Sequence, residues 1–233
     1  MNPLQRPHSI HLLCDPDRWT PRQLNAMLKD IPSCVASVIV GGTYIHSEHF
    51  SPIMDVCAKS GLPVGNILTA GALDSMLSCR ASFAILPILL GCAQTKFLTD
   101  HVIQAAPTIE RLRLLPIPTA YLMFDGGINT SMQFFTQQHP IPRGKPEIVR
   151  TLVTAATQLG LQMVYLEAGS GAENRITVAE LTAARKATKL PILVGGGIDN
   201  VTSCRDLFDA GATGIVLGSI LERRRKISWL KAL

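Results

Sequence analysis

Eight short apolar runs, each followed by a polar stretch with helical spacing, constrain the fold of this chain more than any other feature. The runs are rich in leucine and β-branched residues and cover residues 8–14, 35–40, 62–68, 83–90, 119–124, 163–167, 192–194 and 214–217. Strands that are apolar throughout are typical of parallel sheets buried on both faces. Eight units in 233 residues leave about 29 residues for each, close to the length of one strand–helix unit. The pattern predicts an α/β fold and favours a closed (β/α)8 barrel of the TIM type over an open sheet.

The stretches between the runs predict helices at residues 21–29, 46–60, 96–105, 146–159, 178–189, 201–210 and 220–230. Two of these have clear start signals. Thr177 stands three residues before Glu180 in a capping-box spacing, and Asn200 can cap the helix that follows it. The stretch 69–80 lacks helical periodicity, so we expect the third helix to be short, lost or replaced. No linker or internal repeat interrupts the pattern, and we expect a single domain over residues 1–233.

Composition excludes several classes of protein. Hydrophobic residues make up 47% of the chain and charged residues 17%, a balance that disordered proteins do not have. No apolar run is long enough to span a membrane, and the first residues lack the apolar core of a secretion signal. The six cysteines are scattered without a Cys-x-x-Cys pair, which indicates neither a zinc site nor a disulfide framework. We therefore expect a cytoplasmic protein.

The basic residues are concentrated near the C-terminus. Four of them stand together at 223–226, and without them the net charge of +5 falls to about +1, so we expect no nucleic-acid partner. In the same tail, Trp229, Leu230 and Leu233 would share one side of a helix. We favour a helix that closes the bottom of the barrel with its basic run in solvent. The alternative is peripheral contact with anionic lipid at the inner membrane face.

Glycine-rich loops follow the last two predicted strands. They contribute Gly195, Gly196, Gly197, Gly218 and Ser219. In TIM barrels these two loops often bind a phosphate, and glycine exposes backbone N–H groups to a ligand. Three consecutive glycines exceed what a tight turn needs, although tight turns alone are the alternative. We predict a phosphate site, to which the hydroxyl of Ser170 can add a donor.

Tyr165 and Glu167 alternate with Leu166 on the sixth predicted strand, so both side chains are expected to point into the barrel. A buried carboxylate needs a partner or a chemical role. We favour a functional role for Glu167, and a structural ion pair is the alternative.

Asp15 follows the first predicted strand and precedes a proline. Mg²⁺ keeps several waters and uses few protein ligands, so a carboxylate at the barrel mouth can hold it. Thr43, at the end of the neighbouring strand, can add an oxygen or contact a phosphate. For Asp15 the alternative is an Asx-type turn.

Two segments resemble the geranylgeranylglyceryl phosphate synthase family, which includes the bacterial heptaprenylglyceryl phosphate synthases. Residues 159–172 contain Tyr-Leu-Glu-Ala-Gly-Ser-Gly-Ala, and residues 191–198 read Pro-Ile-Leu-Val-Gly-Gly-Gly-Ile. The segments 15–17, 41–43, 101–107, 117–121 and 140–146 resemble the same family. The likeness is dense from 117 to 219 and patchy from 62 to 100.

The resemblance implies a modified (β/α)8 barrel and Mg²⁺-dependent transfer of a polyprenyl group from its diphosphate to a hydroxyl of sn-glycerol 1-phosphate. It implies that Tyr165 and Glu167 hold the glycerol part of the acceptor, and Glu167 is our candidate general base. At the acceptor phosphate it implies Ser170, Gly195, Gly197, Gly218 and Ser219. At the Mg²⁺–diphosphate it implies Asp15 and Thr43.

Most departures from the family pattern lie on the prenyl-diphosphate side. Residues 91–96 read Gly-Cys-Ala-Gln-Thr-Lys where relatives commonly carry an Arg-Asn-Pro-like segment, and Arg18 and Asp199 replace a usual Lys and Arg. Several functions therefore stay open beside the leading one. They are prenylation of 3-phosphoglycerate or another small phosphorylated acceptor, isomerase or lyase chemistry on a phosphorylated metabolite, and prenyl-phosphate binding without turnover. The oligomeric state, including a homo-oligomer, also stays open.

Overall fold

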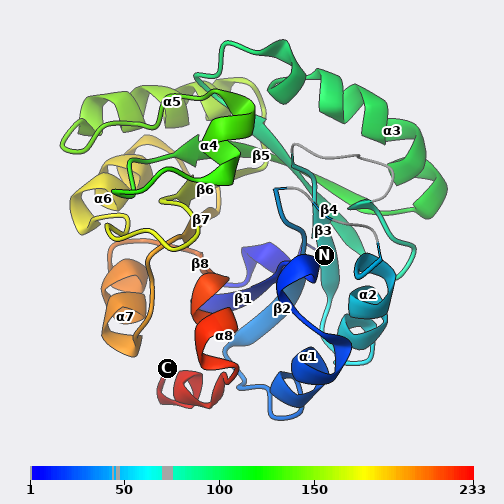
Figure 1. Cartoon of the computed structure of the whole chain (residues 1–233). Coiled ribbons are helices and arrows are strands. Elements are labelled where there is room, and N and C mark those ends of the chain that lie inside the picture. The colour runs from blue at the N-terminus through cyan, green and yellow to red at the C-terminus, as the bar shows by residue number, and fades with distance from the viewer. Residues whose placement is uncertain (1, 44, 46–47, 70–75) are drawn as a thin grey trace.

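The protein is described by a computed structural model over residues 2–43, 45, 48–69 and 76–233. Its centre is a closed barrel in which each strand pairs in parallel with the next, and β8 pairs with β1 (Figure 1). The strands are β1 (Ser9–Cys14), β2 (Val35–Val40), β3 (Val64–Ile67), β4 (Phe83–Leu89), β5 (Leu115–Met123), β6 (Met163–Glu167), β7 (Ile192–Gly195) and β8 (Gly214–Leu217). The predicted (β/α)8 barrel is confirmed.

Helices form a ring outside the strands (Figure 1). They are α1 (Pro21–Met27), α2 (Phe50–Ala58), α3 (Asp100–Leu112), α4 (Ser131–Thr136), α5 (Pro146–Gln158), α6 (Val178–Ala187), α7 (Val201–Asp209) and α8 (Ser219–Arg224). None of the described residues between β3 and β4 lies in an α-helix. Part of that stretch, 70–75, and the predicted helix start at 46 lie outside the described residues. The capping box at Thr177 and the cap at Asn200 are both present.

The alternation of side chains along each strand builds two apolar layers. Met163 and Tyr165 of β6 face a cluster inside the barrel, together with Phe83, Ile117 and other inward residues. The intervening Val164 and Leu166 belong to the larger cluster between strands and helices. The predicted inward direction of Tyr165 is therefore confirmed, and Glu167, two residues further on, shares its face.

β5 begins earlier than predicted, at Leu115 rather than residue 119. The segment contains Pro116 and Pro118, which lower the expectation of a strand because proline cannot donate to a ladder. Pairing with β6 starts only at Thr119 opposite Met163. At both prolines the backbone nitrogen, which carries no hydrogen, faces the β6 side. Because pairing with β6 has not yet begun there, β5 tolerates the two prolines.

A cluster of polar side chains lies inside the barrel near the start of β1. The two ring nitrogens of His11 are 3.0 Å from Ser9 Oγ and 2.8 Å from Ser37 Oγ. Ser9 donates its own proton to the Arg6 carbonyl, so its oxygen accepts from Nε2–H and the neutral ring accepts from Ser37. Burial, aided by the positive charge of Arg6, lowers the pKa of His11 to about 3. His11 is thus an uncharged structural residue.

The C-terminal tail is not the continuous helix predicted for 220–230. Helix α8 ends at Arg224 because Arg225 takes a left-handed conformation, and a 3-10 turn follows at Ser228–Ala232. Leu230 is fully buried. The guanidinium groups of Arg224 and Arg225 lie 5.0 Å and 4.2 Å from the rings of Trp229 and Trp19. Arg225 is therefore packed on the protein, whereas Arg223, Arg224 and Lys226 are exposed, as predicted for the basic run.

No helix in the described part of the chain is long and apolar enough to cross a membrane.

Candidate active site

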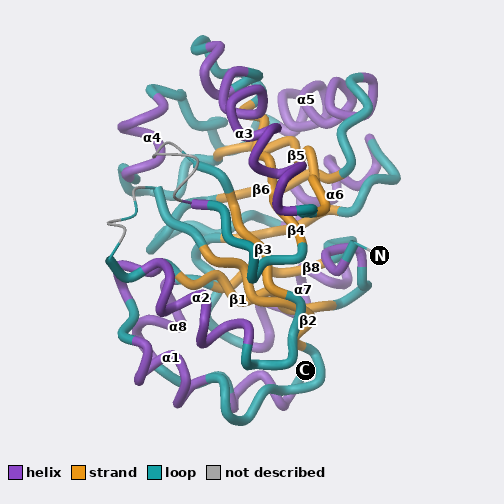
Figure 2. Tube along the Cα trace, turned by 90° about the vertical axis from the view of Figure 1, so that its right-hand side faces the viewer, coloured by secondary structure: helices purple, strands orange, loops and turns teal. Residues whose placement is uncertain are grey.

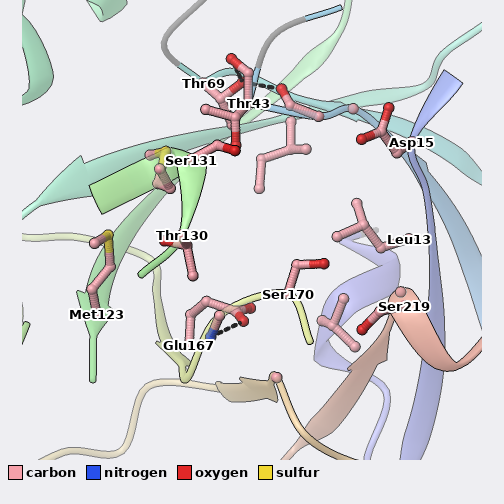
Figure 3. Close-up of a pocket in the computed structure, with 18 of the residues that line it drawn as sticks. Leu13, Asp15, Thr43, Thr69, Met123, Thr130, Ser131, Glu167, Ser170 and Ser219 are labelled. Atoms are coloured by element: carbon pink, nitrogen blue, oxygen red, sulfur yellow. Dashed lines mark hydrogen bonds between the residues drawn. The ribbon is translucent and has the colours of Figure 1, made fainter. Parts of the chain in front are cut away.

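A cavity of about 600 Å³ opens at the carboxyl ends of the strands. The predicted site residues that line it are Asp15, Thr43, Tyr165, Glu167, Ser170, Gly196, Gly218 and Ser219. Figure 3 shows Glu167, Ser170 and Ser219 facing Asp15 and Thr43 across the open centre. Residues as far apart in the sequence as Asp15 and Ser219 thus meet in one chamber, as the barrel prediction requires. The predicted phosphate residues Gly195 and Gly197 are not among the residues that line it.

Glu167 occupies the floor of this chamber at the end of β6. Its Oε1 accepts a hydrogen bond of 2.7 Å from the Gly169 backbone N–H, and its carboxylate also accepts one from the Tyr165 hydroxyl. Burial raises the pKa of Glu167, and these two hydrogen bonds partly oppose the rise. Within the described part of the chain it has no ion pair. The structural ion-pair alternative is therefore not supported.

Tyr165 is held rigidly beside that carboxylate. Its ring packs edge-on against Tyr121, with ring centres 5.1 Å apart. Burial and the neighbouring charge of Glu167 raise the pKa of the Tyr165 hydroxyl well above its usual value. The phenol is therefore a neutral hydrogen-bond donor and is unsuited to act as a base.

The three consecutive glycines have a packing role that the sequence did not reveal. A Cβ on Gly195 would lie 2.5 Å from Glu167 Oε2 and 2.6 Å from the Tyr165 hydroxyl. A Cβ on Gly196 would lie 2.6 Å from the Gly169 nitrogen. Gly196 and Gly197 also take positive φ angles of 84° and 69°, which favour glycine. The β7 loop therefore makes room for the acid and for the loop after β6.

The loop after β6 meets the start of α8. Ser219 Oγ accepts a hydrogen bond of 3.1 Å from the Gly171 backbone N–H. Ser170 is exposed beside this contact and lines the chamber. Gly169 and Gly171 have φ angles of 103° and 76°. Two hydroxyl groups and a tightly turned backbone thus converge on one corner, an arrangement suited to an anion.

Asp15 lies at the opposite side of the chamber. It caps the short turn Pro16–Arg18, with Oδ1 accepting from the Asp17 N–H at 3.0 Å. The Asx-type turn is therefore present. Burial raises the pKa of Asp15 to about 6, and the negative charges of Asp17 and Glu222 add to the rise. A turn alone does not require a carboxylate that is costly to ionise.

The groups around Asp15 fit a Mg²⁺ ion that is bound mainly by a substrate. A cation would relieve the repulsion among Asp15, Asp17 and Glu222, all three of which line the chamber. Thr43 lines it as well, and the Thr69 hydroxyl donates to the Gly42 carbonyl beside it. No cluster of three His, Cys, Asp or Glu ligands that could hold a metal exists among the described residues. Mg²⁺ typically uses one or two carboxylates plus phosphate oxygens. The carboxylates around Asp15 match this coordination preference.

Sequence reasoning missed the helix that covers one side of the chamber. Residues 129–133 and Phe135, from the turn before α4 and from the helix itself, line the cavity. Figure 2 shows α4 at the end of the barrel opposite the N-terminus. Its signal was present, because Thr130 and Gln133 form a capping box. The helix is only six residues long, too short to show a periodicity.

An apolar wall joins the two polar sides. Ile67, Tyr121, Met123 and Met132 line the cavity and belong to the cluster inside the barrel, and Phe135 adds its ring from α4. Figure 3 shows Met123 on this side. The site therefore combines two polar ends with a surface for a hydrocarbon.

The segment 91–96, which differs from the family pattern, supports helix α4. Cys92 Sγ donates to the Thr136 carbonyl, and the Gln94 amide donates to Gln137 Oε1 at 2.8 Å. In the other direction Gln138 donates to the Leu90 carbonyl at 3.1 Å. The altered loop after β4 thus fixes the end of α4.

Comparisons with known proteins agree with this architecture. The protein of Spirosoma linguale named geranylgeranylglyceryl phosphate synthase is 32% identical over 216 residues, 91% of this chain and 85% of that protein. The protein of Methanosphaera stadtmanae with the same name is 30% identical and covers 95% of this chain and 90% of its own length.

A solved structure extends the likeness to three dimensions. The crystal structure of (S)-3-O-geranylgeranylglyceryl phosphate synthase from Thermoplasma acidophilum, in complex with its substrate sn-glycerol-1-phosphate, aligns with a TM-score of 0.86 at 25% identity. The alignment covers 98% of this chain and 92% of that one. The family described as the PcrB family matches residues 4–232 of this chain. This protein therefore belongs to the PcrB family and, like its relatives named geranylgeranylglyceryl phosphate synthase, is a prenyltransferase.

Proposed function

We propose that this enzyme transfers a polyprenyl group from its diphosphate to a hydroxyl of sn-glycerol 1-phosphate. The observation that carries the proposal is the division of one chamber. The Glu167, Ser170 and Ser219 side suits a small phosphorylated alcohol, the Asp15 and Thr43 side suits a diphosphate with a cation, and an apolar wall lies between them. This combination is what a reaction between a hydrophobic diphosphate and a small phosphate requires.

On the acceptor side, Ser170 and Ser219 bind the phosphate with the turned backbone at Gly196 and Gly218. The relative from Thermoplasma acidophilum was crystallised with sn-glycerol-1-phosphate, which supports this choice of acceptor. Tyr165 and Glu167 hold the glycerol part. Fixing the acceptor hydroxyl in this way converts part of the binding energy into correct orientation.

On the donor side, Asp15 and Thr43 hold Mg²⁺ together with the diphosphate. When bound, the ion supplies positive charge that stabilises the negative charge developing on the leaving group. The apolar wall receives the prenyl chain and keeps water from the reacting carbon.

The bond changes balance within these two substrates. The bond between the prenyl carbon and the diphosphate oxygen breaks, and an ether bond forms between that carbon and the acceptor hydroxyl oxygen. The hydroxyl proton passes to Glu167. A carboxylate whose pKa is raised by burial is a stronger base than an exposed one, and this suits the role.

A transfer assay with radiolabelled prenyl diphosphates tests the proposal. Donors of several chain lengths are combined with sn-glycerol 1-phosphate, sn-glycerol 3-phosphate or 3-phosphoglycerate, with Mg²⁺ or with EDTA. We expect a prenyl ether of sn-glycerol 1-phosphate that forms only with Mg²⁺. Product from 3-phosphoglycerate alone would reassign the acceptor. Donor binding without any product would instead identify a non-catalytic prenyl-phosphate binder.

A further inference from the structure

Arg143 lies between α4 and α5, outside the chamber, and all three of its guanidinium nitrogens donate hydrogen bonds. Nε donates to the Asp125 carbonyl at 2.6 Å, and Nη2 donates to the Asn174 carbonyl at 2.6 Å. Nη1 donates to the Arg175 carbonyl at 3.1 Å and to Glu180 Oε2 at 2.8 Å. One side chain thus contacts the loop after β5, the loop after β6 and helix α6.

The two loops already touch through their backbones. The Gly126 carbonyl accepts from the N–H groups of Glu173 and Asn174, at 2.9 Å and 3.0 Å. A Cβ on Gly126 would press against the Ala168 carbonyl and would lie 2.8 Å from the Ala172 Cβ. The carbonyls of residues 125, 174 and 175 point away from this contact toward Arg143. The arginine therefore completes a junction that the backbone alone leaves open.

The second of these loops carries the corner that we assign to the acceptor phosphate. Between Ala168 and Arg175 stand Gly169, bonded to Glu167, and Gly171, bonded to Ser219. Ser170 lies between them. Any shift of residues 173–175 is transmitted to these groups, because only a few residues separate them.

The chemistry of this junction requires arginine. A planar guanidinium can serve several acceptors in one plane, whereas the ammonium group of lysine acts as a point charge. Glu180 also caps α6, accepting from the Thr177 N–H at 2.8 Å. Its side chain is only 5% exposed, so its charge depends on Arg143 for compensation.

We propose that Arg143 is a positioning residue that holds the loop after β6 in the geometry that binds the acceptor phosphate. The proposal rests on the proposed function for the identity of the ligand. It assigns no contact between Arg143 and the substrate.

The test measures binding of sn-glycerol 1-phosphate by calorimetry to the wild-type protein and to Arg143→Lys and Arg143→Ala. We expect the acceptor Kd and KM to rise about tenfold or more, as displacement of a substrate-orienting group predicts, while the KM of the prenyl donor stays within about twofold. Arg143→Lys keeps the charge beside Glu180 and is the informative variant if Arg143→Ala does not fold. A purely structural role would lower the melting temperature without separating the two KM values.

Asp206→Asn is the matched control. It removes the ion pair between Arg175 and Asp206, 3.2 Å long, from the same loop but leaves the carbonyl contacts of Arg143 intact. We expect its acceptor Kd to be unchanged. Equal effects of Asp206→Asn and Arg143→Lys would overturn the proposal.

Amide hydrogen exchange separates this inference from the proposed function. We expect faster exchange at Gly169 and Gly171 in Arg143→Lys, whatever the ligand proves to be. Wild-type protein that does not bind sn-glycerol 1-phosphate would contradict the proposed function. Unchanged exchange in the variant would contradict the positioning role.

Discussion

Gly195 and Glu167 fit together so closely that any side chain on the glycine would displace the carboxylate. A Cβ at residue 195 would lie 2.5 Å from Glu167 Oε2. The two residues are this close because they belong to neighbouring strands whose register pairs them directly. Gly195, the last residue of β7, thus makes room for the acid. This pairing explains how the carboxylate fits at the end of the strand.

Glu167→Gln tests the acid itself. The amide keeps the shape of the carboxylate but removes its charge and its capacity to accept a proton. We expect kcat/KM to fall at least about tenfold, which corresponds to about 1.4 kcal/mol. Steady-state kinetics check the result, with the melting temperature as a control for folding. A small kinetic effect with a large loss of stability would indicate a structural role only.

Gly197→Asp tests the phosphate corner. A carboxylate placed there would repel the phosphate, and we expect the acceptor KM to rise strongly. Because Gly197 has a φ of 69° and a Cβ would lie 3.0 Å from the Ala172 carbonyl, any substitution also strains the loop. Gly197→Asn is therefore the control, since asparagine has nearly the same size and tolerates this conformation. Equal acceptor KM values in the two variants would remove charge repulsion from the explanation.

Asp15 predicts an acidic limb in the pH profile. Because its pKa is raised to about 6, falling pH protonates the carboxylate and would weaken the Mg²⁺ binding that we propose for it. We expect kcat/KM to decline below about pH 6, and more Mg²⁺ to move the decline to lower pH because the ion favours the charged form. Asp15→Asn should lower kcat, raise the Mg²⁺ requirement and leave acceptor affinity nearly intact.

A neighbouring variant sharpens this test. The charge of Asp17 raises the pKa of Asp15, so Asp17→Asn should move the acidic limb to lower pH. Full activity of Asp15→Asn at ordinary Mg²⁺ would leave Asp15 as a turn residue only.

His11 predicts a loss of stability in acid. The unfolded chain binds a proton at this residue near pH 6.5, whereas the folded chain resists it until about pH 3. Its contribution is therefore complete above about pH 6.5 and declines as the pH falls below that value, with a limiting slope of about 1.4 kcal/mol per pH unit. Urea unfolding at pH 7.5 and pH 5 measures the free energy of unfolding. His11→Gln should show a smaller decrease, and identical decreases would refute the assignment.

The tail predicts weak contact with lipid. Its apolar residues Ile227 and Leu230 are buried, and Arg224 and Arg225 stack on tryptophan rings. We expect little sedimentation with anionic liposomes at moderate salt. Lipid binding that disappears in an Arg223→Ala and Lys226→Ala double variant, with folding unchanged, would support the peripheral membrane alternative.

Local patterns in the sequence determined the barrel and which of the predicted site residues meet at its mouth. The apolar runs predicted all eight strands within a few residues, because strands buried on both faces must be apolar throughout. Strand parity placed Tyr165 and Glu167 inside, and the barrel topology then required Asp15, Thr43 and Ser219 to meet at one end. The family resemblance assigned these residues their roles.

Tertiary structure decided what depends on contacts between distant segments. The need for glycine at residue 195 comes from Glu167 on the adjacent strand, and the clamp at Arg143 comes from three carbonyls in two loops. Helix α8 ends early where Arg225 reaches Trp19, more than two hundred residues away. Such features leave no periodic trace along the chain, because a sequence pattern records the environment of each residue within its own element, whereas these positions are set by the neighbour that packs against them.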